Sequence, residues 1–372
     1  MKKKIKKLFI NGCNISHGGP LTILKEAIIS ANLYLKKNWE INLIIFDKRI
    51  FSKKEIIFLK KNKIKIYQFP RIKNSWVQRI LHELFFFRKK FKNVKIDLWL
   101  SIQDVTTLIK AKKKYVYCHN PIPFYRMSFK DIYFEPISFI RGLLFKAIYK
   151  INILSNDGII VQQSWLRELF SEWTNHKNII VSQPNFEKKN KNITYKKKLR
   201  KKIFIYPSVP RFQKNFEVVC KAAEILIKKG IKCFQIKLTF KANENRYSKF
   251  LYKNYSKYNQ IKFIGYQNKK NMDRLYKLSD SLIFSSKLET WGLPISEAAE
   301  NGLQLFIAKK NYAYETVGSY KKVNFFNESD PIHLSKLMND YIRGELRNSK
   351  LKKIKIKKPY TKNWKEFWKL IK

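Results

Sequence analysis

The sequence has few cysteines, few acidic residues and no long apolar run. Its 372 residues include four cysteines without a C-x-x-C pair, which excludes an evident disulfide framework and is typical of a reducing cytoplasm. No apolar stretch reaches the roughly 18 residues that cross a bilayer. The apolar run after the first lysines is too short for a signal peptide. We therefore expect a cytoplasmic protein.

The scarcity of acidic residues leaves a strong positive charge. The sequence has 79 Lys and Arg but only 27 Asp and Glu, which gives a net charge of +52. Such a surface is drawn to nucleic acid or to an anionic membrane. No zinc-finger, RNP-like or homeodomain pattern is present, and the basic residues are spread along the whole length. The charge therefore favours anionic lipid headgroups as a partner, with a basic nucleic-acid-binding protein as the alternative.

Short apolar runs alternate with helical patterns and predict parallel sheets covered by helices. The first series lies at Leu8–Ile10, Ile41–Phe46, Ile64–Phe69, Leu98–Leu100, Tyr115–Cys118 and Gly158–Val161. A second series lies at Ile203–Tyr206, Ile236–Phe240, Ile261–Ile264, Ser281–Ser285 and Leu305–Ile307. The prediction is an α/β fold with two Rossmann-like doubly wound domains that face each other across a cleft between their strand ends.

Changes in composition place the domain boundaries. Residues 1–186 form the predicted N-terminal domain, the charged stretch 187–202 a linker, and residues 203–358 the C-terminal domain. Residues 359–372 form a last helix whose apolar side chains share one face, and we expect it to pack back on the N-terminal domain. Residues 76–92 have a helical period with bulky apolar and basic side chains; they form either a core helix or a surface helix that dips into a membrane interface.

Two carboxylates flank a predicted turn and helix start. Glu289 and Glu297 lie eight positions apart, with Gly292 and Pro294 between them. A buried strand precedes this stretch and a helix follows Pro294, so the N–H groups of Leu293 to Ser296 could hold a diphosphate while the carboxylates bind sugar hydroxyls. In the alternative reading, Glu297 in the first helical turn only complements the helix dipole and Glu289 is solvated.

Three further positions follow predicted strands, where α/β proteins bind ligands. His119 comes at the end of the run Tyr115–Cys118, the pair Gly18-Gly19 lies between the first strand and its helix, and Lys214 precedes a helix in the second half. Lys214 could hold a phosphate as a point charge. A structural histidine and an ordinary surface lysine are the alternatives.

These motifs resemble the retaining glycosyltransferases of the GT-B fold that share a Glu-(seven residues)-Glu motif, often called family 4. The resemblance rests on Glu289 and Glu297 with TWGLPIS between them, the Gly18-Gly19 loop, YCHNP at His119, VQQSW, YPSVPRFQKN and the aromatic last helix, in family order over nearly the whole chain. YPS…KN and YCHNP look most similar to enzymes that extend lipid-linked O-antigen or capsule oligosaccharides in bacteria.

The resemblance implies roles for individual residues. Glu289 would face the donor sugar, His119 would approach that sugar from the other domain, and Glu297 would bind the ribose of a nucleotide-sugar donor. Lys214 would hold the diphosphate, whereas Trp291, Gly292 and Leu293 would line sugar and diphosphate through their backbone. Gly18 and Gly19 would let the backbone approach the diphosphate or the acceptor. Many members carry an arginine where this chain has Ser208, and Arg211 is the candidate substitute.

The implied reaction is transfer of a sugar, with retention of its configuration, to a polyprenyl-diphosphate-linked glycan in O-antigen or capsule synthesis. The enzyme would be peripheral on the inner face of the cytoplasmic membrane. No D-x-D motif is present, so we expect no metal and no cofactor. A glycosyltransferase fold that has lost activity and serves as a scaffold is a further alternative.

Overall fold

The structure is a computed structural model that describes residues 5–73, 75–184, 201–352 and 354–372. The chain divides into a first unit of residues 1–124, 143–185 and 356–372, and a second unit of residues 125–142 and 186–355. The predicted linker 187–202 lies almost entirely outside the described residues.

Residues 125–142 were expected in the N-terminal domain, but they pack with the second unit. Phe134 explains the difference, because its ring centroid lies 5.3 Å from that of Phe212 and 5.3 Å from that of Tyr247. Both partners belong to the second half of the sequence. No sequence pattern within residues 125–142 predicts aromatic contacts with residues so much later in the chain.

In the described residues, the first unit contains a parallel sheet of eight strands in the order β14-β7-β6-β5-β4-β1-β2-β3. Its strands are β1 (Lys6–Asn11), β2 (Trp39–Ile45), β3 (Lys65–Gln68), β4 (Leu98–Ser101), β5 (Lys113–Tyr117), β6 (Gly158–Val161), β7 (Ile179–Ser182) and β14 (Tyr360–Thr361). Both faces of the sheet are covered: Leu8 and Ile10 of β1 join one apolar cluster, and Phe9 between them joins another. Burial on both faces explains why its strands are continuous apolar runs.

The helices of the first unit connect these strands. They are α1 (Gly18–Leu35), α2 (Lys53–Lys61), α3 (Trp76–Leu81), the π-helical segment η3 (His82–Phe86), α4 (Phe87–Lys90), α6 (Pro136–Lys150), α7 (Ser164–Thr174) and α14 (Trp364–Ile371). Helix α6 crosses from the second unit into the first at residue 143. The helix predicted over residues 76–92 is thus made of three consecutive segments, with a π-helical turn in its middle.

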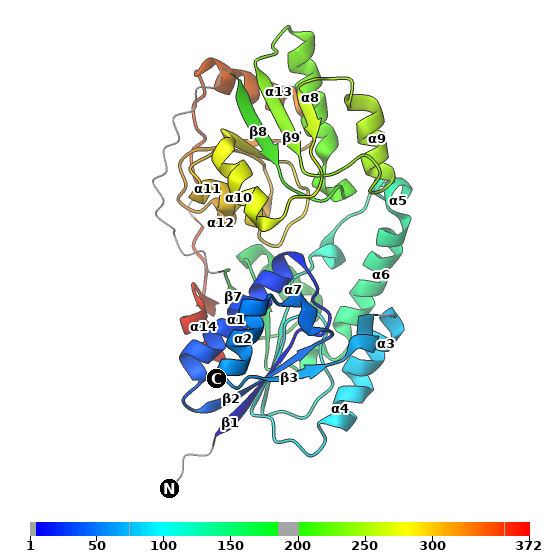
Figure 1. Ribbon diagram of the computed structural model, residues 1–372, viewed down its shortest axis with the longest axis vertical. Helices are drawn as coiled ribbons and strands as arrows, with labels where there is room; N and C mark the ends of the chain where they lie inside the picture. The colour runs from blue at the N-terminus through cyan, green and yellow to red at the C-terminus, as the bar shows by residue number, and fades with distance from the viewer. Residues whose placement is uncertain (1–4, 74, 185–200, 353) are drawn as a thin grey trace. The chain divides into compact units, whose positions relative to one another are not determined.

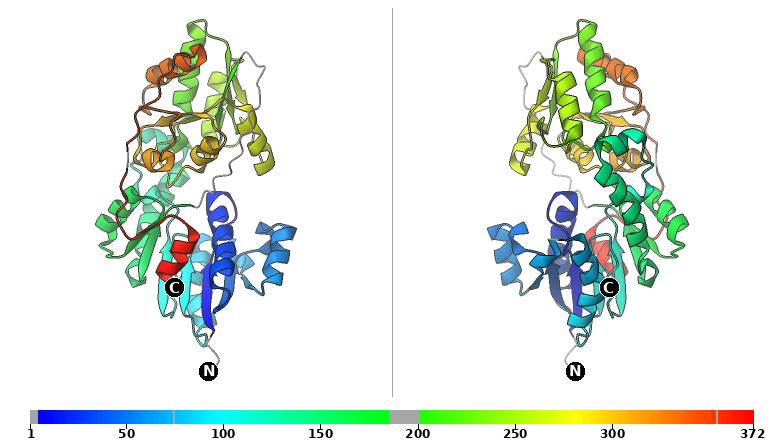
Figure 2. Two further views of the ribbon diagram at one scale, coloured as in Figure 1. Left: turned by 90° about the vertical axis from the view of Figure 1, so that its left-hand side faces the viewer. Right: turned by 90° about the vertical axis from the view of Figure 1, so that its right-hand side faces the viewer.

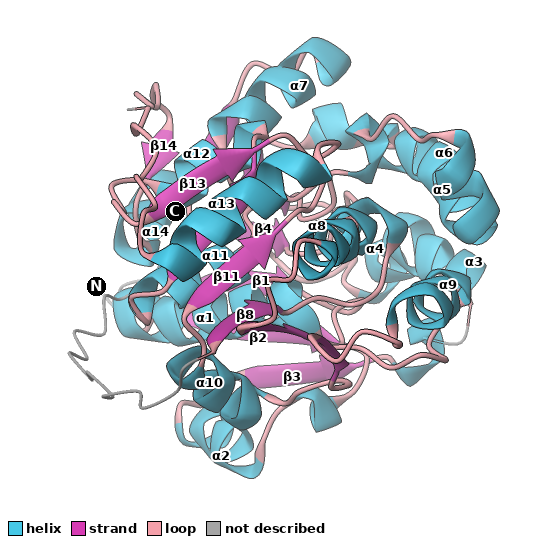
Figure 3. Cartoon of the chain, turned by 90° about the horizontal axis from the view of Figure 1, so that it is seen from above, coloured by secondary structure: helices cyan, strands magenta, loops and turns pink. Residues whose placement is uncertain are grey.

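In the described residues, the second unit contains a parallel six-stranded sheet in the order β10-β9-β8-β11-β12-β13. Its strands are β8 (Lys202–Tyr206), β9 (Phe234–Leu238), β10 (Ile261–Phe263), β11 (Ser281–Phe284), β12 (Gln304–Ala308) and β13 (Val323–Phe326). Its helices are α5 (Phe129–Phe134), α8 (Phe216–Lys228), α9 (Arg246–Tyr255), α10 (Lys269–Leu278), α11 (Leu293–Glu300), α12 (Asn311–Val317) and α13 (Pro331–Arg343). Helix α8 lies beside α13 (Figure 1), and α11 packs on β11 and β12 (Figure 3).

The predicted fold class is confirmed, because each unit holds a parallel sheet with helices on it. Strands β7, β13 and β14 were not predicted; residues 359–372 were expected to form only a helix. In both sheets every described strand pair is parallel. The carboxyl ends of neighbouring strands therefore meet at one edge of each sheet, and the loops that follow them are brought together.

The last helix, α14, packs against α1 in the first unit (Figure 2). The side chains of Phe367, Trp368 and Ile371 are fully buried. The indole Nε1 of Trp368 donates to Ser30 Oγ at 2.8 Å, so the buried polar atom of this large side chain has a partner. The helix thereby joins the core of a unit whose other residues are hundreds of positions earlier in the chain.

We expect Trp368→Ala to lower the free energy of unfolding by about 4 kcal/mol, since it removes a buried aromatic and leaves a cavity. Leu370→Ala, on the exposed face of the same helix, should change it by less than about 0.5 kcal/mol. Urea unfolding followed by far-UV circular dichroism measures both. Equal unfolding midpoints for the two variants would contradict the packing of α14.

Candidate active site

Two loops at the carboxyl edge of the second sheet carry the candidate donor-binding residues. Strand β8 leads into the short helical turn η6 (Phe212–Lys214), and β11 leads into the loop with Glu289. Because β8 and β11 are parallel neighbours, the two loops meet. Lys214 Nζ forms an ion pair with Glu289 Oε1, and their side chains are only 16% and 15% exposed. The structure thus brings together two residues that lie 75 positions apart.

The backbone of the Lys214 loop is fixed by hydrogen bonds to its carbonyl groups. The Lys214 carbonyl accepts from Tyr206 Oη at 2.5 Å and from Ser285 Oγ at 3.1 Å. Asn215, in the left-handed conformation with φ of 55°, donates from Nδ2 to the Glu328 carbonyl at 2.7 Å. The ammonium group is therefore presented by a loop that is held on two sides, as a preorganised site requires.

Gly292 begins helix α11 in a way that only glycine allows. Its φ is +83°, and a Cβ placed there would lie 3.1 Å from Ile295 Cδ1. Because Gly292 itself is the N-cap, the helix begins at Leu293, one residue earlier than expected, and its first turn contains no acidic residue. The prediction that Glu297 lies in the first turn was therefore wrong. Glu297 is in the second turn, which also weakens the helix-dipole explanation for its presence.

The helix start offers fewer free donors than expected. Pro294 has no N–H, and the Ile295 N–H already donates to the Gly292 carbonyl at 2.9 Å. The neighbouring Trp291 is buried: its indole Nε1 donates to Ser296 Oγ at 3.0 Å, and its carbonyl accepts from Thr316 Oγ1. The loop from Trp291 to Leu293 is thus a rigid wall rather than a row of open N–H groups.

Glu297 has a partner that the sequence did not suggest. Its Oε2 accepts a hydrogen bond from Tyr276 Oη at 2.8 Å. Burial raises the pKa of Glu297 above its ordinary value, although the tyrosine hydroxyl acts in the opposite direction. A carboxylate with one oxygen fixed in this way keeps its other oxygen for a hydroxyl of a ligand.

Arg211 was expected to substitute for the missing arginine at Ser208, but the structure engages it elsewhere. Arg211 Nη1 lies 3.2 Å from Glu135 Oε2, and the other oxygen of Glu135 accepts from the Phe212 N–H at 2.7 Å. Ser208 bonds through its N–H to Thr239 Oγ1 at 3.0 Å. Glu135 therefore holds the loop that carries Lys214, and Arg211 contributes to that support.

In the first unit, His119 follows β5 in a tightly held turn. Asp104 Oδ1 accepts from the backbone N–H of His119 and, at 3.0 Å, from that of Asn120. The imidazole stacks on the Tyr117 ring, with 4.6 Å between centroids. Its Nε2 is buried and has no hydrogen-bond partner among the described residues. Burial lowers the pKa of His119 to about 4, so the ring is neutral at physiological pH.

The remaining candidates in the first unit are at the start of α1. Gly18 is its first residue and has a φ of +73°, and a Cβ placed there would lie 3.9 Å from Pro20 Cδ, an ordinary contact distance. Gly19 follows within the helix. Within the described residues, no cluster of three or more His, Cys, Asp or Glu side chains is arranged to hold a metal ion. The same residues include no helix that is both long and apolar enough to cross a membrane.

Sequence reasoning missed Glu135 and Tyr276. Glu135 contacts Arg211 across 76 positions, and Tyr276 contacts Glu297 across 21 positions. Neither residue lies in a motif, and no spacing rule connects residues that meet only through the tertiary fold. Co-variation between such pairs is the kind of signal that would have revealed them.

Comparisons with known proteins agree with this geometry. Residues 186–358 match the family model for Glycosyl transferases group 1. No curated protein sequence matches the chain. Similar solved structures include the apo form of lipopolysaccharide outer core galactosyltransferase WaaB, which is 14% identical, covers 92% of each chain and has a TM-score of 0.63.

Two further structures are similar. A glycosyltransferase from Rickettsia africae ESF-5 is 15% identical over 91% of this chain and 88% of its own, with a TM-score of 0.62. Anabaena Alr3699/HepE in complex with UDP-glucose is 14% identical over 91% of this chain and 90% of its own, with a TM-score of 0.59. At these identities the likeness shows the fold, which is that of GT-B glycosyltransferases. With its group 1 domain in residues 186–358, the chain is a glycosyltransferase.

The neutral state of His119 predicts a specific pH dependence of stability. Its folded pKa of about 4 lies below the ordinary value, so between these two pKa values only the unfolded chain takes up the proton, and stability falls as pH falls. From about pH 7 to about pH 5, wild type should lose about 2 kcal/mol more than His119→Gln. Urea unfolding at both pH values measures the difference, and parallel losses in the two proteins would show that His119 titrates normally.

Proposed function

We propose that this chain is a retaining glycosyltransferase that moves a sugar from a nucleoside-diphosphate donor to a polyprenyl-diphosphate-linked glycan in bacterial surface polysaccharide synthesis. The observation that carries the proposal is the ion pair between Lys214 and Glu289 at the carboxyl edge of the second sheet. Anionic nucleotides bind at such edges in α/β folds. The Anabaena structure named above is a complex with UDP-glucose, which supports a nucleotide-sugar donor for this chain.

The ion pair indicates what the donor would do on binding. Without a ligand, Lys214 and Glu289 neutralise each other in a place where few waters reach them. A diphosphate brings two adjacent negative groups and competes with a single carboxylate for the ammonium. Lys214 would then bind the diphosphate, and Glu289 would be released to accept hydrogen bonds from the sugar hydroxyls.

The same groups would stabilise the leaving group. As the bond between the anomeric carbon and the phosphate oxygen breaks, negative charge grows on the diphosphate, and Lys214 with the amino end of α11 opposes that charge without a metal. The acceptor oxygen bonds to the anomeric carbon on the same face, and the leaving phosphate oxygen takes the acceptor's proton. No carboxylate is required as a covalent nucleophile. Glu297, held by Tyr276, would bind the ribose.

A neutral His119 fits a hydrogen-bonding role toward the donor sugar better than that of a general acid, since its pKa of about 4 keeps it unprotonated at neutral pH. Its buried, unpartnered Nε2 gives it an unused hydrogen-bonding position. That His119 reaches the sugar bound by the second unit stays a prediction, as do the roles of Gly18 and Gly19.

We expect Glu289→Gln and Glu297→Gln each to lower sugar transfer by about 100-fold or more, because each removes a charged contact to the donor. Glu345→Gln is the matched control, since this glutamate forms only an exposed ion pair with Arg343. A thermal-shift screen with UDP-, GDP- and dTDP-sugars first identifies the donor. Transfer is then measured with that labelled sugar and a membrane extract as the acceptor source.

The outcomes of this experiment separate the alternatives. Full activity in both glutamine variants would refute the proposed site. Binding of a nucleotide sugar without turnover on any acceptor would indicate an inactive scaffold. Failure to bind any nucleotide sugar, combined with nucleic-acid binding that falls steeply with salt and does not need Glu289, would indicate the nucleic-acid-binding alternative.

We also propose that the enzyme lies on the inner face of the cytoplasmic membrane through the segment α3–η3–α4. The segment has a core face and an exposed apolar face, because Phe87 is buried while Val77, Leu81 and Phe85 are 63%, 48% and 62% exposed. These three residues are spaced by four and form one helical row. The segment ends in Arg88, Lys89 and Lys90, so apolar and basic groups are adjacent, as in helices that bind anionic leaflets.

The double variant Leu81→Glu, Phe85→Glu should lower binding to vesicles of equimolar phosphatidylglycerol and phosphatidylcholine by about tenfold or more, because it removes apolar burial and adds repulsion. Sedimentation of the full chain with the vesicles measures it. The control is the double variant Ile57→Glu, Ile332→Glu, which replaces two exposed apolar residues elsewhere. It changes the net charge by the same amount. Equal loss in both doubles would mean that net charge alone, and no particular helix, governs binding.

A further inference from the structure

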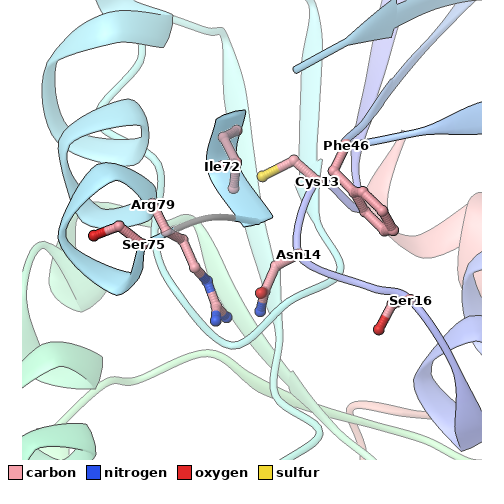
Figure 4. A pocket seen from close by; sticks show the side chains of 7 residues that line it. All are labelled: Cys13, Asn14, Ser16, Phe46, Ile72, Ser75 and Arg79. Atoms are coloured by element: carbon pink, nitrogen blue, oxygen red, sulfur yellow. The ribbon is translucent and has the colours of Figure 1, made fainter. Parts of the chain in front are cut away.

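A polar pocket lies in the first unit between the loop after β1 and helix α3 (Figure 4). Its volume is about 150 Å³, well above the roughly 10–15 Å³ that one water needs. Its polar wall is formed by Asn14, Ser16, Ser75 and Arg79, and Phe46 adds an apolar side. None of these residues has a part in the donor site proposed above.

Arg79 is the unusual member of this pocket. The residue is partly buried, and burial of its guanidinium lowers its pKa, although an arginine remains charged at any physiological pH. Within the described part of the chain its side chain forms no hydrogen bond and no ion pair, whereas its backbone N–H donates to the Ser75 carbonyl at 3.1 Å. A partly buried charge whose side chain has no hydrogen-bond partner favours an anionic ligand in the pocket.

The carboxylates of Asp104 and Glu83 both act on Arg79 through space, but neither forms an ion pair with it, and Asp104 Oδ1 already accepts from the backbone N–H groups of His119 and Asn120. Glu83 is fully buried, and its two oxygens accept from Asn11 Nδ2 at 3.2 and 3.1 Å, from Cys13 Sγ at 3.1 Å and from Thr107 Oγ1 at 2.5 Å. Gln103 Nε2 donates to it as well. The carboxylate is therefore held in place by its own donors, and it acts on Arg79 only through space.

The same network fixes the floor of the pocket. Gln103 Oε1 accepts from the Asn14 N–H at 3.0 Å and from Cys13 Sγ at 3.2 Å. Glu83 itself is turned inward by the π-helical segment η3, and its carbonyl accepts from the Leu108 N–H at 2.8 Å. π-Helical insertions of this kind often occur at functional sites. The pocket is thus preorganised before any ligand arrives.

The side chains that line the pocket favour a phosphate group as the ligand. The Arg79 guanidinium, with the Asn14 amide beside it (Figure 4), matches the oxygens of a phosphate, which arginine binds with two parallel hydrogen bonds. The helix that carries Arg79 also exposes Val77 and Leu81. An anionic head beside an apolar chain fits this combination better than a free phosphate ion does.

We propose that this pocket binds the diphosphate of a prenyl-diphosphate-linked acceptor, with Arg79 as its charged ligand. The inference rests on the proposed function, because it assigns the group by which the lipid-linked acceptor is recognised. It adds a second anion site, in the first unit, to the donor site of the second unit. Lipid-linked acceptors would then be distinguished from free oligosaccharides by their diphosphate.

Binding of farnesyl diphosphate to the full chain tests this pocket directly. In isothermal titration calorimetry at physiological salt, Arg79→Gln should weaken binding by about tenfold or more, since it removes the charge-assisted hydrogen bonds. Arg246→Gln, at an exposed arginine that begins α9 in the second unit, is the matched charge control and should change binding less than about twofold. Equal effects of the two variants would overturn the proposal.

Two further ligands distinguish the sources of the phosphate. Farnesol should not bind, and inorganic pyrophosphate should bind through Arg79 but more weakly than farnesyl diphosphate. Pyrophosphate binding as tight as that of farnesyl diphosphate would overturn the assignment to a lipid. Arg79→Lys should restore part of the affinity, whereas a merely structural role of Arg79 would leave farnesyl diphosphate binding unchanged in every variant that folds by circular dichroism.

The binding of farnesyl diphosphate is measured without sugar transfer, so the two proposals can fail separately. Binding of the donor nucleotide should be unchanged in Arg79→Gln, and its loss there would place the donor in this pocket instead and overturn the proposal. If Glu289→Gln keeps full transfer, the proposed donor site fails while the farnesyl diphosphate titration still reports on the pocket.

Discussion

Parallel pairing of neighbouring strands brings the loops with Lys214, Glu289 and His119 to the carboxyl edges of the two sheets. In the second unit, the pairing of β8 with β11 brings Lys214 next to Glu289. In the first unit, β1, β4 and β5 are consecutive in the sheet, so the loops with Asn14, Gln103 and His119 follow adjacent strands. Side chains far apart in the sequence thus become neighbours because strand direction is shared, and loop sequences can vary without loss of this arrangement.

Burial of charge then determines which of these groups are ready for a ligand. A buried ion without a partner is destabilising by several kcal/mol in general, so folding selects partners: Glu289 for Lys214, and four donor side chains for Glu83. Arg79 is an exception, since it is partly buried and its side chain forms no hydrogen bond or ion pair within the described residues. A ligand at Lys214 must replace Glu289 as the partner of the ammonium group. A ligand at Arg79 instead gives a partner to a side chain that has none within the described residues. The two proposed anion sites therefore differ in how binding is driven.

The sequence predicts those features that depend on local chemistry. Apolar runs such as Ile203–Tyr206 identify strands buried on both faces, and Gly292 before Pro294 identifies the turn into α11. It does not predict Glu83, because a charged residue in an amphipathic helix is expected to face solvent, and only the π-helical turn directs it inward. The start of α11 was misplaced for a similar reason: the left-handed Gly292 caps the helix directly. Partners such as Glu135 for Arg211 arise from tertiary packing, which no local pattern encodes.

The net charge of +52 cannot by itself choose between anionic partners. At physiological ionic strength, exposed charges are screened beyond about 8 Å, so the lysine-rich surface raises the local concentration of any polyanion and speeds encounters. Discrimination requires charges that water and salt do not reach. Lys214 and Arg79 come closest to this condition among the candidate ligand groups, because each is partly shielded from solvent in its own unit. In the proposed function, the surface charge would draw the protein to an anionic membrane, and these two cations would select the phosphate groups that it binds there.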